Sequence, residues 1–348
     1  MIPIFNAQNR LLKKAIEAKH VAALASGIKR KLRAFKGSYV ASDENVRKYL
    51  EYIWSFSVEE ILAMDITRMR EVVKTVNDLL PSTCFYRQRN LKASKLEFKT
   101  VNEQLANIFD YTEFSKEKSS WCLGRLALEL QKVIRICPYC NAETVYAYQV
   151  LKGSRSKYTI RKSSFDHYFP KARYPFFSVS LYNLIPACAR CNSGFKGERF
   201  RDLGLMLHPY ADRESFHASM KFRVLFKTLK GFGSCTAEDI DQMLLTERKD
   251  DKRCEGGVIW EELFQLGEIY SSVYKESVAD ILVKFLQYPK SYIDMLCASL
   301  CRHGIPLARF ESLVYGSMLN ADDINKNRLS KVAMDLYDTY CNDARCGA

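Results

Sequence analysis

Apolar residues recur every three or four positions over long stretches near both ends of the chain, the spacing that gathers them on one face of a helix. The first stretch runs from Leu11 to Phe35 and carries many lysines and arginines. Ser57 and Glu60 form a capping-box pattern, which predicts a helix that begins there and ends near Pro81. The same periodicity predicts later helices over Val258–Leu286, Ser291–Cys301 and Asp322–Tyr340.

The middle of the chain has short runs rich in aromatic and β-branched residues, which favour strands. Two of them are joined by Lys152–Lys157, whose glycine and serines suit a turn. The expected strands are Val145–Val150, Tyr158–Ile160, a segment through Asp166 and His167, a segment reaching Asn183, and Phe222–Phe226, with a helix opening near Cys191. The interval from Tyr168 to Ser180 is expected to be a loop. The pattern predicts an α+β fold that is predominantly α.

The 348 residues, of which 47% are hydrophobic, are enough to bury a substantial core. We expect a helical region at 1–115, a central core at 116–205 and a mostly helical region at 206–348. No apolar run reaches the roughly 20 residues that cross a bilayer, and Met1–Arg10 lacks the apolar stretch and cleavage site of a secretory signal. These features predict a soluble, cytoplasmic protein with no membrane partner.

The net charge of +13 is concentrated in the middle of the chain. Residues 116–205 hold 16 basic and 6 acidic side chains, for a net +10, whereas 1–115 carry +6 and 206–348 carry −3. Such a basic region attracts polyanions and makes their binding sensitive to salt. Arg155, Lys157, Arg161 and Lys162 are candidates to follow a phosphate backbone, although a solvated turn explains them equally well.

Four cysteines lie in two Cys-x-x-Cys pairs, Cys137 with Cys140 and Cys188 with Cys191. Each pair places two thiolates on a tight turn, and together they can complete the tetrahedral sulfur shell that zinc prefers in structural sites. Without a secretory signal, a reducing compartment disfavours disulfides. The prediction is a structural zinc, and the alternatives are redox pairs or core thiols.

Between and after these pairs stand Asp166-His167-Tyr-Phe-Pro-Lys171, Leu181-Tyr-Asn183-Leu-Ile-Pro186 and Cys191-Asn192-Ser-Gly-Phe-Lys196-Gly197. In this order and spacing the segment from Cys137 to Gly197 resembles the HNH endonuclease family, in its ββα-metal form with an accessory zinc knuckle. The resemblance implies a ββα-metal core, flanked here by the helical regions, and a phosphodiester-cleaving activity.

Cleavage of a phosphodiester needs a deprotonated water and a cation on the phosphate. His167 is the candidate general base, since an imidazole can accept the water's proton at neutral pH. Asp166 points to the opposite side of an extended segment and, with Asn192, offers hard oxygen ligands that suit magnesium or manganese. The alternatives are an ordinary half-buried histidine, and turn or cap roles for Asp166 and Asn192.

Asn183 resembles the central asparagine of the family, which implies that its side chain ties down the loop carrying the base and orients the imidazole; a plain strand-end residue is the alternative. Asn192 departs from the family name, which has histidine there, and this should weaken the binding of soft metals. Lys171 and Lys196 are either phosphate contacts or solvated surface lysines.

The residues of these motifs more narrowly resemble the PtuB nucleases of Septu anti-phage systems, including those associated with retrons. That resemblance implies a partner ATPase of the PtuA type that restrains or delivers the nuclease. We therefore predict a metal-dependent endonuclease that cuts DNA, or a structured RNA such as tRNA, as the effector of a defence complex. The alternative is a zinc-dependent nucleic-acid-binding or assembly module without nuclease activity.

Overall fold

The computed structural model of the chain divides into two compact units. The N-terminal unit comprises residues 7–132 and 145–204, and the C-terminal unit comprises 1–6, 133–144 and 205–348. The division expected from the sequence shares only the boundary near 205 with these units and stays a prediction. The structure describes residues 3–80, 93–117, 119–152, 157–196, 206–210, 220–247, 255–288, 290–300, 314–315, 319 and 324–342.

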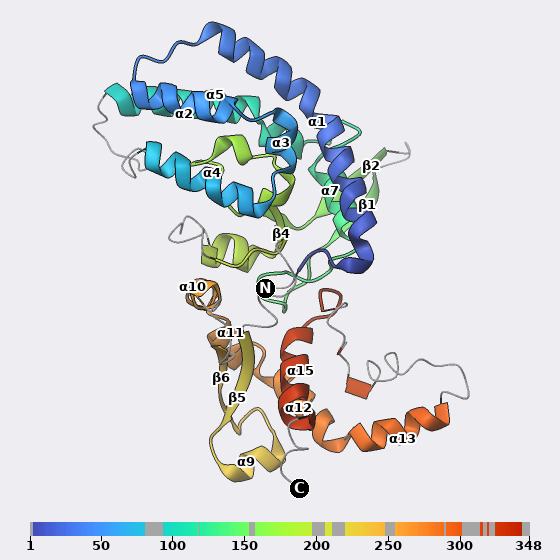
Figure 1. The fold of residues 1–348 in the computed structure, drawn as a ribbon. Coiled ribbons are helices and arrows are strands. Elements are labelled where there is room, and N and C mark those ends of the chain that lie inside the picture. Colours follow the sequence, from blue (N-terminus) through green and yellow to red (C-terminus); the bar gives the residue numbers. More distant parts are fainter. Residues whose placement is uncertain are drawn as a thin grey trace. The chain divides into compact units, whose positions relative to one another are not determined.

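The N-terminal unit is built mainly of helices, with two small antiparallel sheets inserted late in its sequence (Figure 1). Its helices and 3-10 turns before the sheets are η1 Ala7–Asn9, α1 Arg10–Ser38, α2 Glu44–Trp54, α3 Val58–Ala63, α4 Ile66–Leu79, α5 Ala93–Ile108, α6 Tyr111–Ser115 and α7 Leu123–Leu130. There follow β1 Ala147–Lys152, β2 Lys157–Lys162, β3 Ser164–His167, η3 Pro175–Phe177, η4 Leu181–Asn183, β4 Leu184–Ala187 and η5 Arg190–Lys196.

Helix α1 confirms the helical period read from Leu11 to Phe35 and packs against α3, α5 and α7. His20 lies on its buried face, where Nε2 is 2.7 Å from the Val179 carbonyl oxygen and Nδ1 accepts a hydrogen bond from the Trp121 indole. A carbonyl oxygen can only accept, so this imidazole is neutral, with its proton on Nε2. Burial lowers the pKa of His20 to about 4, which keeps this core histidine uncharged at neutral pH.

The capping box at Ser57 is present, since its hydroxyl accepts from the Glu60 amide and the Glu60 carboxylate accepts from the Ser57 amide. The single helix expected from there to Pro81 is wrong, because α3 ends at Ala63 and α4 starts at Ile66. Asp65 stops the first helix by capping the second: its carboxylate accepts a hydrogen bond from the Arg68 amide at 3.0 Å.

The segment from Tyr168 to Ser180 has the expected loop character, with one 3-10 turn, but most of it is buried. Its aromatic side chains pack against one another, and they are Tyr168, Phe169, Tyr174, Phe176 and Phe177. Polar contacts fasten it to α3 and α4, where the Ser180 hydroxyl donates to the Ile61 carbonyl and the Tyr174 hydroxyl donates to the Asn77 side chain. The loop after His167 is therefore part of the core.

The C-terminal unit pairs one antiparallel hairpin with helices (Figure 1). Its elements are β5 Met220–Phe226, α9 Leu229–Ser234, β6 Ile240–Glu247, α10 Glu255–Phe264, α11 Leu266–Ser272, α12 Lys275–Gln287, α13 Lys290–Leu300, α15 Ser330–Tyr337 and η8 Asp338–Asn342. The expected helix over 258–286 is three helices, broken at Gln265, whose φ is 49°, and at Tyr274. Strand β6 has no counterpart in the sequence prediction.

The described residues thus form a mixed α+β fold that is mostly helical and has three two-stranded antiparallel sheets, which confirms the predicted class. None of the helices in the described ranges has the length and apolarity that a membrane span requires. Residues 153–156, where a turn with Arg155 was expected, and the cysteine at position 301 lie outside the described residues.

Candidate active site and four-cysteine cluster

Asp166 and His167 lie at the end of strand β3, which pairs antiparallel with β4. In this register Asp166 stands opposite Ile185, and His167 stands opposite Leu184. Successive side chains of a strand point to opposite faces, as expected for this pair. Asp166 is 5% exposed, so its carboxylate lies inside the protein and needs a partner.

His167 is held by a backbone carbonyl and an aromatic ring. Its Nε2 lies 2.9 Å from the Ser178 carbonyl oxygen, and the Tyr111 ring meets it edge-on at 4.5 Å between centroids. Because the carbonyl accepts, Nε2 carries the proton and Nδ1 is the basic nitrogen of the neutral ring. Burial lowers the pKa of His167 to about 4, against the opposing effect of the Ser178 carbonyl. The imidazole is therefore neutral at pH 7, with Nδ1 unprotonated.

Asn183 is fully buried and ties together the loop that follows His167. Its side-chain oxygen accepts from the Phe169 amide at 2.7 Å, and its side-chain nitrogen donates to the carbonyls of Phe169 and Phe177, both at 3.0 Å. Phe177 precedes Ser178, the residue that holds the imidazole. These bonds are those that a brace for the base-carrying loop would make; a catalytic part for Asn183 stays a prediction.

Lys196 reaches Asp166 from η5, the π-helix that starts two residues after Cys188. Its ammonium donates to Asp166 Oδ2 at 2.6 Å, to the His167 carbonyl at 2.5 Å and to the Tyr168 carbonyl at 3.0 Å. An ammonium has three donors, and these contacts use them all. Burial lowers the pKa of Lys196, while Asp166 acts in the opposite direction. The sequence reading of Lys196 as a surface lysine or a phosphate contact is wrong, since the residue is 1% exposed.

Asn192 lies on η5 four residues before Lys196, and its amide donates to the Cys188 carbonyl at 3.0 Å. Asn192 is half-buried on this short segment, and its part as the second oxygen ligand stays a prediction.

The pair of Lys196 and Asp166 gives a prediction about stability. Lys196→Met leaves a buried carboxylate without its cation, and we expect the free energy of unfolding to fall by about 3–5 kcal/mol. Urea denaturation measures the loss. Lys171→Met is the control: this exposed lysine sits 4.5 Å from the Tyr111 ring centroid, and its loss should cost about 1 kcal/mol at most. Equal losses in both variants would refute the assigned role, whereas adding Asp166→Asn to Lys196→Met should restore part of the stability.

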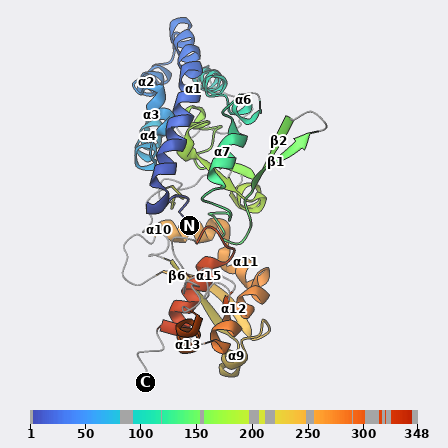
Figure 2. The ribbon, with the colours of Figure 1, turned by 90° about the vertical axis from the view of Figure 1, so that its right-hand side faces the viewer.

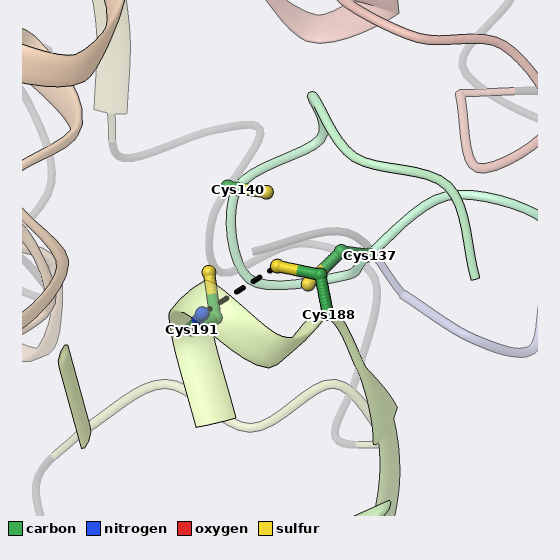
Figure 3. Close-up of side chains that lie close together, drawn as sticks. All are labelled: Cys137, Cys140, Cys188 and Cys191. Atoms are coloured by element: carbon green, nitrogen blue, oxygen red, sulfur yellow. Dashed lines mark hydrogen bonds between the residues drawn. The ribbon is translucent and has the colours of Figure 1, made fainter. Parts of the chain in front are cut away.

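The two Cys-x-x-Cys pairs come together in one buried cluster (Figure 3). The sulfur atoms of Cys137, Cys140, Cys188 and Cys191 all lie within 4.8 Å of one another. Four sulfurs held tetrahedrally at about 2.3 Å from a zinc ion would be about 3.8 Å apart, so a small inward movement would suit that ion. The cluster can bind a metal ion such as zinc.

Backbone hydrogen bonds shape the turn at each cysteine pair. The Cys191 amide points at the Cys188 sulfur, at 3.5 Å, and so places a partial positive charge beside it (Figure 3). In the first pair, the Asn141 amide donates to the Cys137 carbonyl, and Asn141 has a φ of 52°, a left-handed conformation that asparagine tolerates. The Asn141 side chain then bonds the Ile324 carbonyl and the Lys331 amide, which fixes this turn within the C-terminal unit.

Three residues of this site were not singled out in the sequence for the parts they take: Lys196 as the partner of Asp166, Ser178 as the carbonyl behind His167, and Tyr111 as the ring beside it. Tyr111 comes from α6, far from the motif in sequence, and no local signal marks it. Ser178 acts through its backbone, which any residue type could provide.

Comparison with known proteins adds one short similarity. No family model matches the chain, and no solved structure resembles it. Protein ea31 of Escherichia phage lambda is 45% identical over 53 residues, which is 15% of this chain and 18% of that protein. The chain therefore matches less than a fifth of this relative, whose name states no activity.

Proposed function

We propose that this chain is a metal-dependent endonuclease of the HNH type, which hydrolyses phosphodiester bonds of DNA or of a structured RNA such as tRNA. The observation that carries the proposal is the setting of His167. Its Nε2 is committed to the Ser178 carbonyl, and the loop behind it is braced by Asn183. A neutral imidazole held by one nitrogen presents the other as a proton acceptor, which is the requirement for a general base that activates water.

The order of elements also supports the proposal. Strands β3 and β4 form an antiparallel pair, and η5 follows with Asn192 and Lys196. Two strands and a helix, with the Asp-His pair on the first strand and an asparagine on the helix, correspond to the ββα-metal arrangement that the motifs resemble. In this reading Asn183 positions the base, and the exposed Lys171 lies near enough to the Tyr111 and His167 rings to meet a substrate phosphate.

A catalytic magnesium or manganese would be held by the Asp166 carboxylate and the Asn192 side-chain oxygen, both hard donors suited to these ions. When bound, such an ion neutralises the charge that grows on the phosphate. The donors are of the right kind, but Lys196 already contacts one oxygen of Asp166 at 2.6 Å. The ion would therefore share this carboxylate with an ammonium group. Such an ion would have few protein ligands, and several water molecules would complete its coordination.

The four-cysteine cluster is proposed to hold a structural zinc. Thiolates are soft ligands and suit zinc, whereas the oxygens of Asp166 and Asn192 suit a harder ion. Zinc would therefore bind at the cysteines, and magnesium or manganese would bind at the oxygen ligands. Cys191 immediately precedes Asn192, and zinc bound there would fix the start of η5.

The narrower resemblance extends the proposal to a role as the effector of an anti-phage complex, with a PtuA-type ATPase as partner, in the cytoplasm. A second function is favoured by one observation: Lys196 neutralises Asp166, which is what a nucleic-acid-binding or assembly module without nuclease activity would retain. The two proposals differ in whether added divalent metal produces strand breaks.

The test is cleavage of supercoiled plasmid and of structured RNA by the purified protein, with magnesium, with manganese and without added divalent metal. We expect strand breaks that depend on the metal, and Asn192→Ala should need a higher metal concentration for the same rate. Ser193→Ala is the matched control, an exposed neighbour on the same helix whose metal requirement should stay unchanged. Binding of either polymer without any cleavage, in every metal condition, would select the second function.

A further inference from the structure

Strands β1 and β2 form a hairpin that is anchored through Ile160 on one face and has exposed side chains on both faces. In its antiparallel register Tyr148 stands opposite Arg161, Gln149 opposite Ile160, and Leu151 opposite Tyr158. Residues directly opposite each other lie on the same face of a sheet, and neighbours along a strand alternate. Tyr148 and Arg161 therefore share one face, and Ile160 and Tyr158 lie on the other.

The face with Ile160 anchors the hairpin to the rest of the N-terminal unit. Ile160 is 7% exposed, and a Cβ placed on Gly124 of α7 would lie 3.0 Å from its Cδ1, so helix and strand approach closely there. The Ile160 amide also donates to the Glu117 carboxylate at 2.9 Å. The hairpin thus has a fixed inner side and extends away from the helices of its unit (Figure 2).

The opposite side, here called the outer face, carries Tyr146, Tyr148, Val150, Thr159 and Arg161. Tyr146 joins it because the strand pairing continues to Ser163, whose amide donates to the Tyr146 carbonyl. Tyr146 and Tyr148 are 48% and 52% exposed, and their ring centroids lie 5.7 Å apart. These two exposed tyrosines lie next to each other on one strand, with Arg161 across from Tyr148, and their rings present apolar area to water.

The chemistry of this face matches unpaired nucleotides. Every base has an aromatic face that can stack on a tyrosine ring, and an arginine can pair with the phosphate between bases. Residues 116–205, which include the hairpin, have a net charge of +10. This charge attracts a polyanion such as a nucleic acid more strongly than a protein surface that has few acidic groups. Bases inside a duplex are already stacked on their neighbours, so only single-stranded segments or loops can use such a surface.

We propose that the outer face of β1 and β2 binds single-stranded nucleic acid, with bases stacked on Tyr146 and Tyr148 and a backbone phosphate at Arg161. The inference rests on the proposed function, since it assigns a substrate-binding surface and favours substrates with unpaired segments. It gives the nuclease a reason to prefer loops, ends or locally opened duplex over a fully paired helix.

Fluorescence anisotropy with a labelled oligothymidylate, the corresponding RNA oligomer and a perfect DNA duplex tests the proposal. The protein is the His167→Ala variant without added divalent metal, so that nothing is cut. Tyr148→Ala should weaken binding of the single strands by about 5- to 150-fold, from about 1–3 kcal/mol per stacked base. Arg161→Gln should reduce the slope of log affinity against log salt by about 1.

Tyr158→Ala is the matched control, since this tyrosine is 54% exposed and stands on the same hairpin but on the other face. Its loss should leave affinity unchanged, with equal melting temperatures for all variants. Equal weakening by Tyr148→Ala and Tyr158→Ala, or a duplex bound as tightly as the single strands, would overturn the proposal.

The binding assay and the cleavage assay fail independently. If the wild type cleaves and Tyr148→Ala binds with unchanged affinity, the proposed hairpin surface is rejected and the proposed nuclease activity is kept. If Tyr148→Ala binds more weakly and the wild type does not cleave, the proposed surface is kept and the nuclease activity is rejected.

Discussion

Replacing His167 by alanine is expected to slow phosphodiester cleavage by about 10²- to 10⁴-fold, the usual contribution of a positioned general base. The imidazole is neutral, its Nε2 is taken by the Ser178 carbonyl, and its basic nitrogen is the group lost. Single-turnover cleavage of a plasmid at saturating magnesium measures the effect directly. Because the substitution removes no metal ligand, the magnesium concentration for half-maximal rate should stay the same.

Added imidazole provides the decisive control for this variant. Truncation at His167 leaves a space beside the Tyr111 ring that free imidazole can enter, so a base role predicts partial recovery of the rate. Recovery should increase with the unprotonated fraction of imidazole. Strand breaks at the wild-type rate in His167→Ala would show that another group takes the proton.

Cys188→Ser is expected to abolish metal binding at the four-cysteine cluster and to destabilise the folded protein severely. Structural zinc contributes about 10–16 kcal/mol to the folding of small zinc-finger peptides, and even a fraction of this exceeds the effect of an ordinary core substitution. The expected wild-type content is one zinc per chain by elemental analysis. The variant should bind none and should melt at a much lower temperature or fail to accumulate as folded protein.

Cys122→Ser separates the loss of a ligand from the loss of a buried thiol. Cys122 is 1% exposed and stands outside the cluster, at the start of α7. This variant should keep its zinc and lose only the modest stability of one buried apolar group. A folded, zinc-free Cys188→Ser protein with wild-type stability would disprove the structural role of the metal.

Periodicity and motif spacing predicted much of the fold because they report local geometry. The long run of α1, the hairpin of β1 and β2, and the strand through Asp166 all follow from residue pattern and turn chemistry. Helix ends were less predictable: Asp65 caps α4 only because the chain turns there, and the same apolar period runs across the break. Strand β6 is a strand because it pairs with β5, and this pairing is a non-local contact that the residue pattern of β6 does not indicate.

The candidate site shows the same limit. Asn183 could be assigned to the loop of the base from its motif, and its three side-chain hydrogen bonds agree with that placement. The partner of Asp166 could not be predicted in this way. A lysine has a long flexible side chain, and the sequence does not indicate where its ammonium group lies. The buried ion pair of Lys196 is a tertiary contact across 30 residues.

The seven residues of η5 place Cys191, Asn192 and Lys196 on one short segment. A single inserted or deleted residue after Cys191 would rotate the lysine away from Asp166 while leaving all four cysteines in place. Substitutions can change the chemistry of this segment one position at a time, but its length is fixed. Engineered or natural variants of this protein should therefore tolerate new residue types at the other positions of η5 far better than gaps.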